Sequence, residues 1–231
     1  MHLIRFGLNY KKLPYTTTWL EFPEIEPTAT QIGAPPTGRK PDGSPFYTTP
    51  IIHDPNTNKT LSNSIDIARY LDDTYPDTLV LPDGEASAQR AKHIEGVFFI
   101  DVAPYVLGIG FLPALQRLNP ASQPYFRATR EAVTGASLED LASPGPERDE
   151  KWRKAEEGFG KLAAAMEKAG LGEEGEHTRR LEYAELVIGA YLVALQRTFG
   201  EESDEWRAIE SWQGGRWKRL VDKLRPYMQD T

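Results

Sequence analysis

The chain has 231 residues, which is enough for one large domain or two small ones. Its net charge of −7 and pI of about 5.3 lack the excess of basic residues that is typical of a nucleic-acid-binding protein. It contains no cysteine, which excludes disulfides, thiolate metal sites and a protein thiol nucleophile. The start has no long apolar core of a signal peptide, and no uninterrupted apolar run reaches the ~20 residues of a membrane span. We therefore expect a soluble, cytoplasmic protein without a membrane or nucleic-acid partner.

The first part of the chain mixes helix and strand patterns. Apolar residues on one helical face predict a helix over 2–11. The β-branched and aromatic run 15–22 (YTTTWLEF) predicts a strand, and 28–32 predicts a turn of helix. The Pro- and Gly-rich segment 33–46 predicts a long loop, a kind of segment that often binds ligands.

The stretch 48–71 (TTPIIHDPNTNKTLSNSIDIARYL) predicts a small binding site. A strand is expected over 48–54, and Pro50 within it indicates an edge, a bulge or a cis turn because proline cannot donate to the ladder. After a tight turn and a short returning strand, a helix is expected from Ser64 to about residue 75. Backbone groups beside Pro50 and the free N–H groups of a helix start could together hold a small anionic peptide.

Beyond a linker at 77–84 the pattern predicts helices only, so we expect an α/β domain at 1–76 and an all-helical domain at 85–231. The first expected helix is long and apolar, covers 86–118, and is kinked at Pro104 and Pro113. A second over 124–141 is expected to break near Gly135, and a third to end near 168. A buried helix is expected at 186–195, and a last one at 205–210 and 216–224, split at Gly214-Gly215. Loops are expected at 143–146 and 170–176.

At Thr49-Pro50 and Asn63-Ser64 the sequence resembles the glutathione S-transferase family. In that family the first domain is thioredoxin-like and ends with a strand entering at a cis-proline, a hairpin, and a helix that begins with an acidic residue or Gln followed by Ser. The resemblance implies a thioredoxin-like N-terminal domain followed by a helical-bundle C-terminal domain. It also implies glutathione as cofactor and a homodimer.

The second half agrees with this resemblance. LEYAE at 181–185 is similar to the capping box that opens the family's buried helix, and 137–152 and 206–217 resemble a fungal etherase-related subgroup. Glu182 replaces the usual Ser or Thr cap, so we expect weaker capping, with Glu185 losing its reciprocal partner. The resemblance covers nearly the whole chain.

The resemblance also implies roles for single residues. Thr49, beside Pro50, would pair its backbone with the cysteinyl part of glutathione, as an added strand does. Ser64, with Asn63 next to it, would hold the γ-glutamyl carboxylate at the helix N-terminus. Taken alone, the proline is more often an ordinary edge or loop residue, and Ser62 or Asn63 a plain helix cap worth about 1 kcal/mol, but their combination and order favour the binding role.

Two basic residues of the long loop, Lys40 and Arg39, could meet the glycyl carboxylate, although solvated loop charges are the simpler reading. Compared with the family pattern, the sequence begins at the helix that normally follows the first strand, so that strand and the residue that stabilises the thiolate are expected to be missing. The N-terminus of helix 2–11 could lower the thiol pKa instead. His2 and Arg5 are the catalytic candidates there, with frayed surface residues as the alternative.

A second-substrate pocket is expected between the domains, against the long apolar helix. Its candidates are Phe98, Phe99, Val102, Tyr105 and Val106, some of which must instead be core, and the acidic Asp101. That acid is either a surface charge between two buried stripes or a polar group facing the cleft.

We therefore expect an enzyme that adds the thiolate of glutathione to a small apolar electrophile, by positioning and thiolate stabilisation. A fungal secondary metabolite is the expected substrate, for instance from a polyketide–peptide pathway such as that of pseurotin. The alternatives are a glutathione-dependent cis–trans isomerase that works by reversible thiol addition, and a non-catalytic glutathione-binding module.

Overall fold

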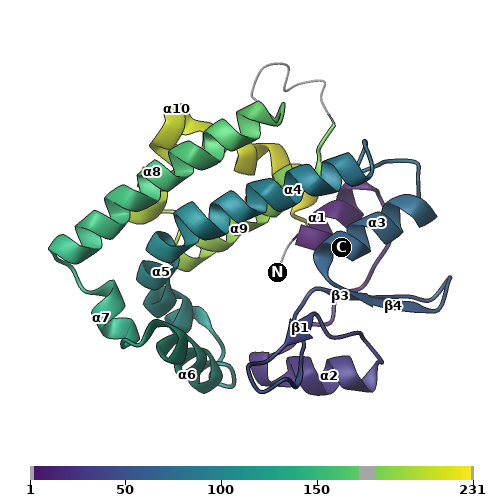
Figure 1. Cartoon of the computed structure of the whole chain (residues 1–231), viewed down its shortest axis with the longest axis horizontal. Helices are drawn as coiled ribbons and strands as arrows, with labels where there is room; N and C mark the ends of the chain where they lie inside the picture. The colour runs from purple at the N-terminus through teal and green to yellow at the C-terminus, as the bar shows by residue number, and fades with distance from the viewer. Residues whose placement is uncertain (1–2, 172–179, 230–231) are drawn as a thin grey trace.

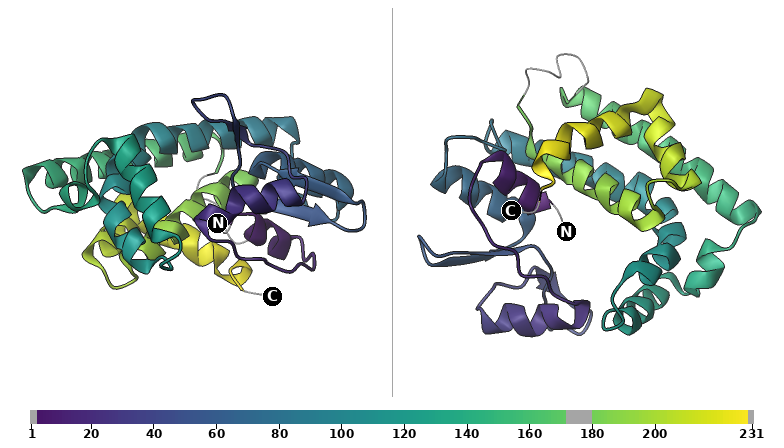
Figure 2. Two further views of the ribbon diagram at one scale, coloured as in Figure 1. Left: turned by 90° about the horizontal axis from the view of Figure 1, so that it is seen from below. Right: turned by 180° about the vertical axis from the view of Figure 1, so that it is seen from behind.

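The computed structural model describes residues 3–171 and 180–229, so His2 and most of the loop expected at 170–176 lie outside the described residues. A smaller part with helices and short strands lies against one end of a larger helical part (Figure 1). Helix α1 contacts both α3 and α9, which joins the two parts, and the views in Figure 2 agree with this arrangement.

The smaller part has short strands and three α-helices among the described residues. Its elements are α1 (Leu3–Tyr10), η1 (Phe22–Glu24), α2 (Ile25–Gln31), β1 (Gly38–Arg39), β2 (Pro45–Phe46), β3 (Ile51–Asp54), β4 (Lys59–Ser62) and α3 (Ser64–Thr74). Strands β3 and β4 pair antiparallel from Ile51 with Ser62 to Asp54 with Lys59, and β1 pairs with β2 as a second small sheet. The long loop expected at 33–46 is therefore interrupted only by the β1–β2 ladder.

The strand expected over 15–22 is wrong. Residues 13–21 have no regular structure, 16–19 are exposed, and Phe22 already belongs to η1. A β-rich composition needs a neighbouring strand to supply ladder hydrogen bonds, and no described strand pairs with this segment.

Asp54, at the end of β3, fixes the β3–β4 hairpin on α3. Its carboxylate accepts hydrogen bonds from the hydroxyls of Tyr70 at 2.5 Å and Tyr75 at 2.6 Å, and from the backbone N–H of Asn56 at 2.9 Å. These donors, the Tyr70 hydroxyl first, lower the pKa of Asp54 because they stabilise its charged form. The hairpin is thus held by a charge that stays ionised.

A second buried acid, Asp72, fastens the segment that follows α3. It forms an ion pair with Lys11 at 2.7 Å, and both side chains are nearly inaccessible to solvent. The same carboxylate accepts the backbone N–H groups of Val80 at 3.0 Å and Leu81 at 2.7 Å. Residues 75–84 contain no helix or strand, but this network fixes them against the smaller part.

The helical part contains α4 (Glu85–Val97), the π-helical turn η2 (Phe98–Val102), α5 (Ala103–Arg117), α6 (Gln123–Thr134), α7 (Leu138–Ala142), α8 (Pro146–Lys168), α9 (Tyr183–Phe199), α10 (Asp204–Leu224) and η3 (Arg225–Tyr227). The kink expected at Pro104 takes the form of η2 directly before it, where a proline N–H is missing from the helix ladder. The break at Gly214-Gly215 is confirmed, since residues 212–215 are non-helical.

The buried core is continuous between the two parts. Leu3 and Phe6 of α1 and Ile67 of α3 belong to the same buried cluster as Leu186 and Ile188 of α9. Helix α9 is buried along most of its length, as its apolar composition predicted. The site between the parts therefore rests on one shared core.

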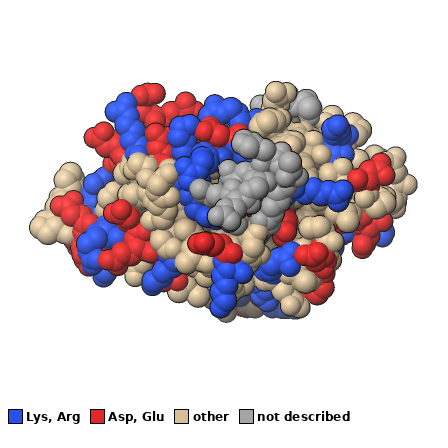
Figure 3. All heavy atoms as spheres, turned by 90° about the horizontal axis from the view of Figure 1, so that it is seen from above, with Lys and Arg blue, Asp and Glu red and all other residues tan. Residues whose placement is uncertain are grey.

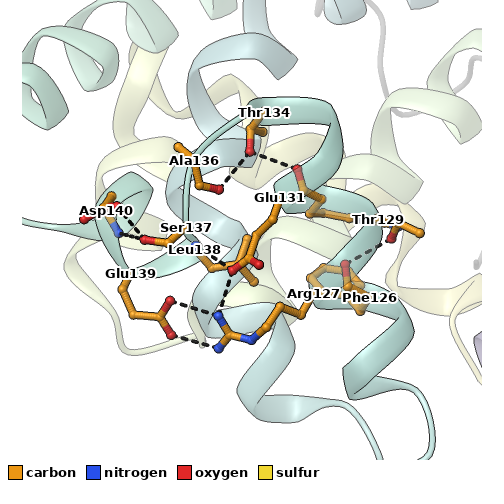
Figure 4. A network of polar contacts seen from close by, with 11 residues as sticks. Phe126, Arg127, Thr129, Glu131, Thr134, Ala136, Ser137, Leu138, Glu139 and Asp140 are labelled. Carbon is orange, nitrogen blue, oxygen red and sulfur yellow. Dashed lines mark hydrogen bonds and ion pairs between the residues drawn. The ribbon is translucent and has the colours of Figure 1, made fainter.

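The helix break predicted near Gly135 is confirmed as the corner between α6 and α7 (Figure 4). Gly135 ends α6 at φ 70°, a conformation that glycine adopts freely. Arg127 donates two hydrogen bonds to Glu139, at 2.9 and 2.8 Å, and one to Glu131 at 2.8 Å (Figure 4). This bidentate pair holds the pKa of Glu139 at about 2.

A second contact between the parts lies at α6. The Glu21 carboxylate accepts hydrogen bonds from the Asn119 amide at 2.6 Å and from the Ser122 hydroxyl, and these lower its pKa. The Phe22 backbone N–H donates to Ser122 at 2.9 Å, and its ring stacks on Tyr125 at a centroid distance of 6.0 Å. The segment before α2 is therefore fastened to the helical part.

The continuous run Glu85–Arg117 is long and apolar enough to cross a membrane by length and composition, with a mean hydropathy of 1.8 over its most apolar window. Asp101 interrupts this run, in line with the expectation that it is not uninterruptedly apolar. The run packs against α8 and α9, which gives it a place in the core of the helical part. On the face shown in Figure 3, basic and acidic side chains are interspersed.

Candidate active site

A cavity of about 590 Å³ lies between the two parts. It brings together Thr49, Pro50, Asn63 and Ser64, the four residues of the stretch 48–71 that the sequence singled out. The remaining lining residues are Leu3, Thr37 and Thr48 from the smaller part and Glu95, Phe99, Ala190, Tyr191, Ala194 and Arg197 from the helical part.

The wall formed by the smaller part combines a proline turn and a helix start. The Thr49–Pro50 peptide bond is cis, one of the three arrangements expected from the sequence. The β3–β4 register begins at Ile51, so the ladder does not use the Thr49 backbone. Asn63, at φ 70°, precedes Ser64, the first residue of α3, whose first-turn N–H groups have no partner within the helix.

Ser64 lies close to the opposite part of the molecule. Its side chain is a neighbour of Tyr183, the first residue of α9. Burial raises the pKa of Tyr183, so this side chain stays neutral. The helix start that forms one wall of the cavity thus lies beside the first residue of a helix that forms the other.

The opposite wall contains the aromatic residues Phe99 and Tyr191, the acid Glu95 and the cation Arg197. Tyr191 of α9 donates a hydrogen bond to Glu95 of α4 at 2.5 Å. Its ring stacks on Phe98 at a centroid distance of 4.6 Å and meets Phe99 edge-on at 5.5 Å. Burial first, and then the bond to Glu95, raise the pKa of Tyr191, which remains a hydrogen-bond donor.

Family comparisons match both parts of the chain. The glutathione S-transferase N-terminal domain matches residues 2–74, and the glutathione S-transferase C-terminal domain matches residues 91–227. The chain belongs to the glutathione S-transferase family. Its fold is accordingly a thioredoxin-like N-terminal domain with few strands followed by a helical C-terminal domain, as the sequence predicted.

Fungal relatives and structures agree with this membership. The glutathione S-transferase-like protein ustS of Aspergillus flavus is 30% identical over 232 residues, which cover 94% of this chain and 79% of that protein. The structure of the glutathione S-transferase CsGST63524 of Ceriporiopsis subvermispora, in complex with glutathione, has a TM-score of 0.89 at 37% identity and covers 99% of this chain and 90% of that one. CsGST83044 of the same fungus, also in complex with glutathione, has a TM-score of 0.86 at 40% identity, covering 96% and 89%.

The second-pocket residues expected on the long helix lie mostly elsewhere. Phe98 and Val102 are buried in the core. Asp101 forms an ion pair with Lys161 of α8 at 2.5 Å, so it is a surface charge and does not face the cleft. The Lys154 ammonium lies over the ring of Tyr105, 5.8 Å from the ring centroid.

Of the residues considered for this pocket, Phe99 lines the cavity, while Val106 is buried in the core. The sequence did not single out Glu95 or Tyr191. Glu95 lies four residues before Phe99, on the same face of the helix run, and this i, i+4 spacing is the signal that could have found it.

The basic candidates also lie away from the cavity lining. Lys40 pairs with Glu26 at 2.7 Å, and Arg39 donates to the carbonyl oxygen of Gly43 at 2.8 Å. Arg5 lies with its guanidinium 5.2 Å from the Trp19 ring centroid. Its helix, α1, nevertheless starts at the cavity, where Leu3 is part of the lining.

The expectation that Glu185 loses its capping partner is wrong. Its carboxylate accepts the backbone N–H of Glu182 at 2.9 Å and also pairs with Lys223 at 2.8 Å. Glu182 itself pairs with Arg90 at 3.0 Å. The hydrogen bond from Glu182 to Glu185 uses only the backbone N–H of the N-cap residue, so an acidic side chain at Glu182 leaves this half of the capping box intact.

Proposed function

We propose that this protein binds glutathione in the cavity between its parts and acts as a transferase that adds the thiolate to a small apolar electrophile. One observation supports this most: the Thr49–Pro50 turn and the start of α3 at Ser64 face a wall whose apolar surface includes Phe99 and the methyl groups of Ala190 and Ala194. The Thr49–Pro50 turn and Ser64 offer backbone and hydroxyl groups for binding a peptide, and the opposite wall offers room for an apolar second substrate.

In this proposal the peptide lies along the smaller part. The Thr49 backbone pairs with the cysteinyl residue, and Ser64 with the N–H groups of α3 holds the γ-glutamyl carboxylate. The thiol lies near the start of α1, where Leu3 borders the cavity. A helix N-terminus lowers a thiol pKa, because its partial positive charge stabilises the thiolate.

The proposed reaction needs little further chemistry from the protein. The thiolate forms a C–S bond with the electrophilic carbon, and the thiol proton ends on the product or on a leaving group. Holding both reactants in one cavity supplies the main rate advantage.

The proposal extends to the setting of the enzyme. The substrate is a fungal secondary metabolite, the protein is cytoplasmic, where glutathione is kept reduced, and two copies form a homodimer. Membership of the etherase-related subgroup stays a prediction. If the adduct instead reverts after bond rotation, the same site isomerises an activated alkene and consumes no glutathione.

Calorimetry with glutathione and S-methylglutathione tests the binding step. We expect Ser64→Ala to weaken binding of both by about 1–3 kcal/mol, the range for hydrogen bonds to charged groups. Ser203→Ala is the matched control, since Ser203 precedes α10 and caps it, its hydroxyl oxygen accepting the Trp206 N–H at 3.1 Å. An unchanged affinity in Ser64→Ala would place the γ-glutamyl group elsewhere, and no binding by the wild type would refute the proposed function.

Binding alone does not separate an enzyme from a binding module. For an enzyme we expect thiolate absorbance from bound glutathione near neutral pH and a product whose mass identifies conjugation, or an unchanged mass with an altered double bond for isomerisation. A module would bind glutathione without thiolate absorbance.

A further inference from the structure

The wall formed by the helical part carries a cation that the proposed function does not use. Among the described residues that line the cavity, Arg197 is the only cation and Glu95 the only carboxylate. Arg197 is exposed and belongs to the last turn of α9. The helix dipole favours a cation in a last turn by about 0.3–1 kcal/mol, which accounts for an arginine at this helix end but not for its place in the cavity lining.

Arg197 continues an apolar surface along α9. Ala190, Ala194 and Arg197 are spaced by four and three residues, so they lie on one face of the helix. At 1.5 Å per residue, Arg197 lies about 10 Å further along the helix axis than Ala190. The alanine side chains occupy little space, and Phe99, which also lines the cavity, is half-exposed. The wall therefore offers an apolar surface that ends at a guanidinium.

A guanidinium at this place can select ligands by their charge. It binds a carboxylate through two parallel N–H···O hydrogen bonds, and its five N–H donors allow this beside another partner. A carboxylate moved from water into an apolar site without a cation is strongly disfavoured. Because one cation and one carboxylate stand among the described lining residues, the cavity suits a ligand group with a single negative charge better than a dianion.

We propose that Arg197 binds a carboxylate of the second substrate. The electrophile is then an apolar molecule with an acidic group at the end away from the reacting carbon, and a neutral apolar compound is a poorer substrate. This inference rests on the proposed function and names its substrate class. Glutathione is proposed to lie along the smaller part, so Arg197, on the opposite wall, determines specificity for the second substrate.

Product-like ligands test this inference without requiring a reaction. The three ligands are S-methylglutathione, S-octylglutathione, and the ω-carboxylate of S-octylglutathione, in which a carboxylate replaces the terminal methyl group of the octyl chain. The octyl chain is flexible and apolar, so its end can reach along the alanine surface to Arg197. Calorimetry compares the three ligands on the wild type, Arg197→Met and Arg207→Met.

The two variants remove the same charge from different places. Met keeps an unbranched apolar side chain at position 197 and removes the guanidinium. Arg207, an exposed residue of α10, is outside the cavity lining and pairs with Glu202 at 2.7 Å. Arg207→Met therefore measures how far the overall charge of the protein alone affects an anionic ligand.

We expect the wild type to bind the ω-carboxylate at least as tightly as S-octylglutathione. Arg197→Met should weaken binding of the ω-carboxylate by about tenfold to hundredfold, the range for hydrogen bonds to a charged group. The same variant should change binding of S-octylglutathione by less than about twofold, which shows that the cavity is intact. Arg207→Met should bind all three ligands as the wild type does.

Several results would overturn the inference. Arg197→Met could leave the ω-carboxylate unaffected, or weaken both long ligands equally, which would make Arg197 only a structural residue of α9. Arg207→Met could weaken the ω-carboxylate as much as Arg197→Met does, or the wild type could bind S-methylglutathione but neither long ligand. In all these cases the binding of S-methylglutathione, and with it the proposed function, would stand. A wild type that binds none of the three ligands would refute the proposed function together with the inference.

Discussion

Gly158 of α8 lies where η2 comes closest to that helix. A Cβ built on it would lie 1.9 Å from the carbonyl oxygen of Asp101 and 2.6 Å from its carbonyl carbon, against an ordinary contact of at least 3.4 Å. Both atoms belong to backbone, so Gly158→Ala must push α8 and η2 apart. Overpacking of this kind costs about 1–3 kcal/mol, occasionally more. The gain in helix propensity from Gly to Ala, about 1 kcal/mol, opposes part of this cost.

Gly160, two residues later on α8, is the matched control. A Cβ there would have the Gln213 amide nitrogen as its nearest atom, at 3.7 Å, so Gly160→Ala gains propensity without a clash. We expect the free energy of unfolding in urea to fall for Gly158→Ala and to rise slightly for Gly160→Ala. Because Phe99 of η2 lines the cavity, Gly158→Ala should also weaken glutathione binding. Equal stability of the two variants would refute this account of how η2 is held.

Two further predictions concern ion pairs. Lys11→Met leaves the buried Asp72 without its cation and should lower the free energy of unfolding, measured in urea, by about 3–5 kcal/mol. The control Lys92→Met changes an exposed residue and should alter the free energy of unfolding by less than about 0.5 kcal/mol. Similar values for both variants would contradict the importance of the Lys11–Asp72 pair. Arg127 lowers the pKa of Glu139 from 4.5 to about 2, so the wild type should melt above Glu139→Gln at neutral pH and lose this advantage as the pH falls from about 4.5 towards 2. A difference in melting temperature that does not change with pH would rule this out.

The sequence could predict one wall of the site because that wall is local. Pro50 and Ser64 lie within one short stretch, and a proline in a strand or a serine at a helix start has a meaning that does not depend on distant residues. The strand expected at 15–22 failed for the opposite reason. Its composition suits a sheet, but a sheet needs a partner strand, and the composition of one segment does not supply it.

The other wall depends on which face of a helix is turned inward. The stripe that contains Phe98 and Val102 was correctly identified as apolar, but a fully buried stripe belongs to the core and leaves nothing for a ligand. The cavity uses the adjoining face, where Glu95 and Phe99 are partly or largely exposed. Periodicity alone could not assign that face, because Tyr191, which completes it, comes from a helix almost a hundred residues further on.

A cavity between two parts is useful for binding only if its walls keep their distance. Two fastenings contribute here: the Asp72 carboxylate fixes the connecting segment, and Glu21 fastens the segment before α2 to the residues that lead into α6. The Lys11–Asp72 and Glu21–Asn119 pairs join side chains that are far apart in the sequence, so the cost of ordering the walls falls on folding and not on ligand binding.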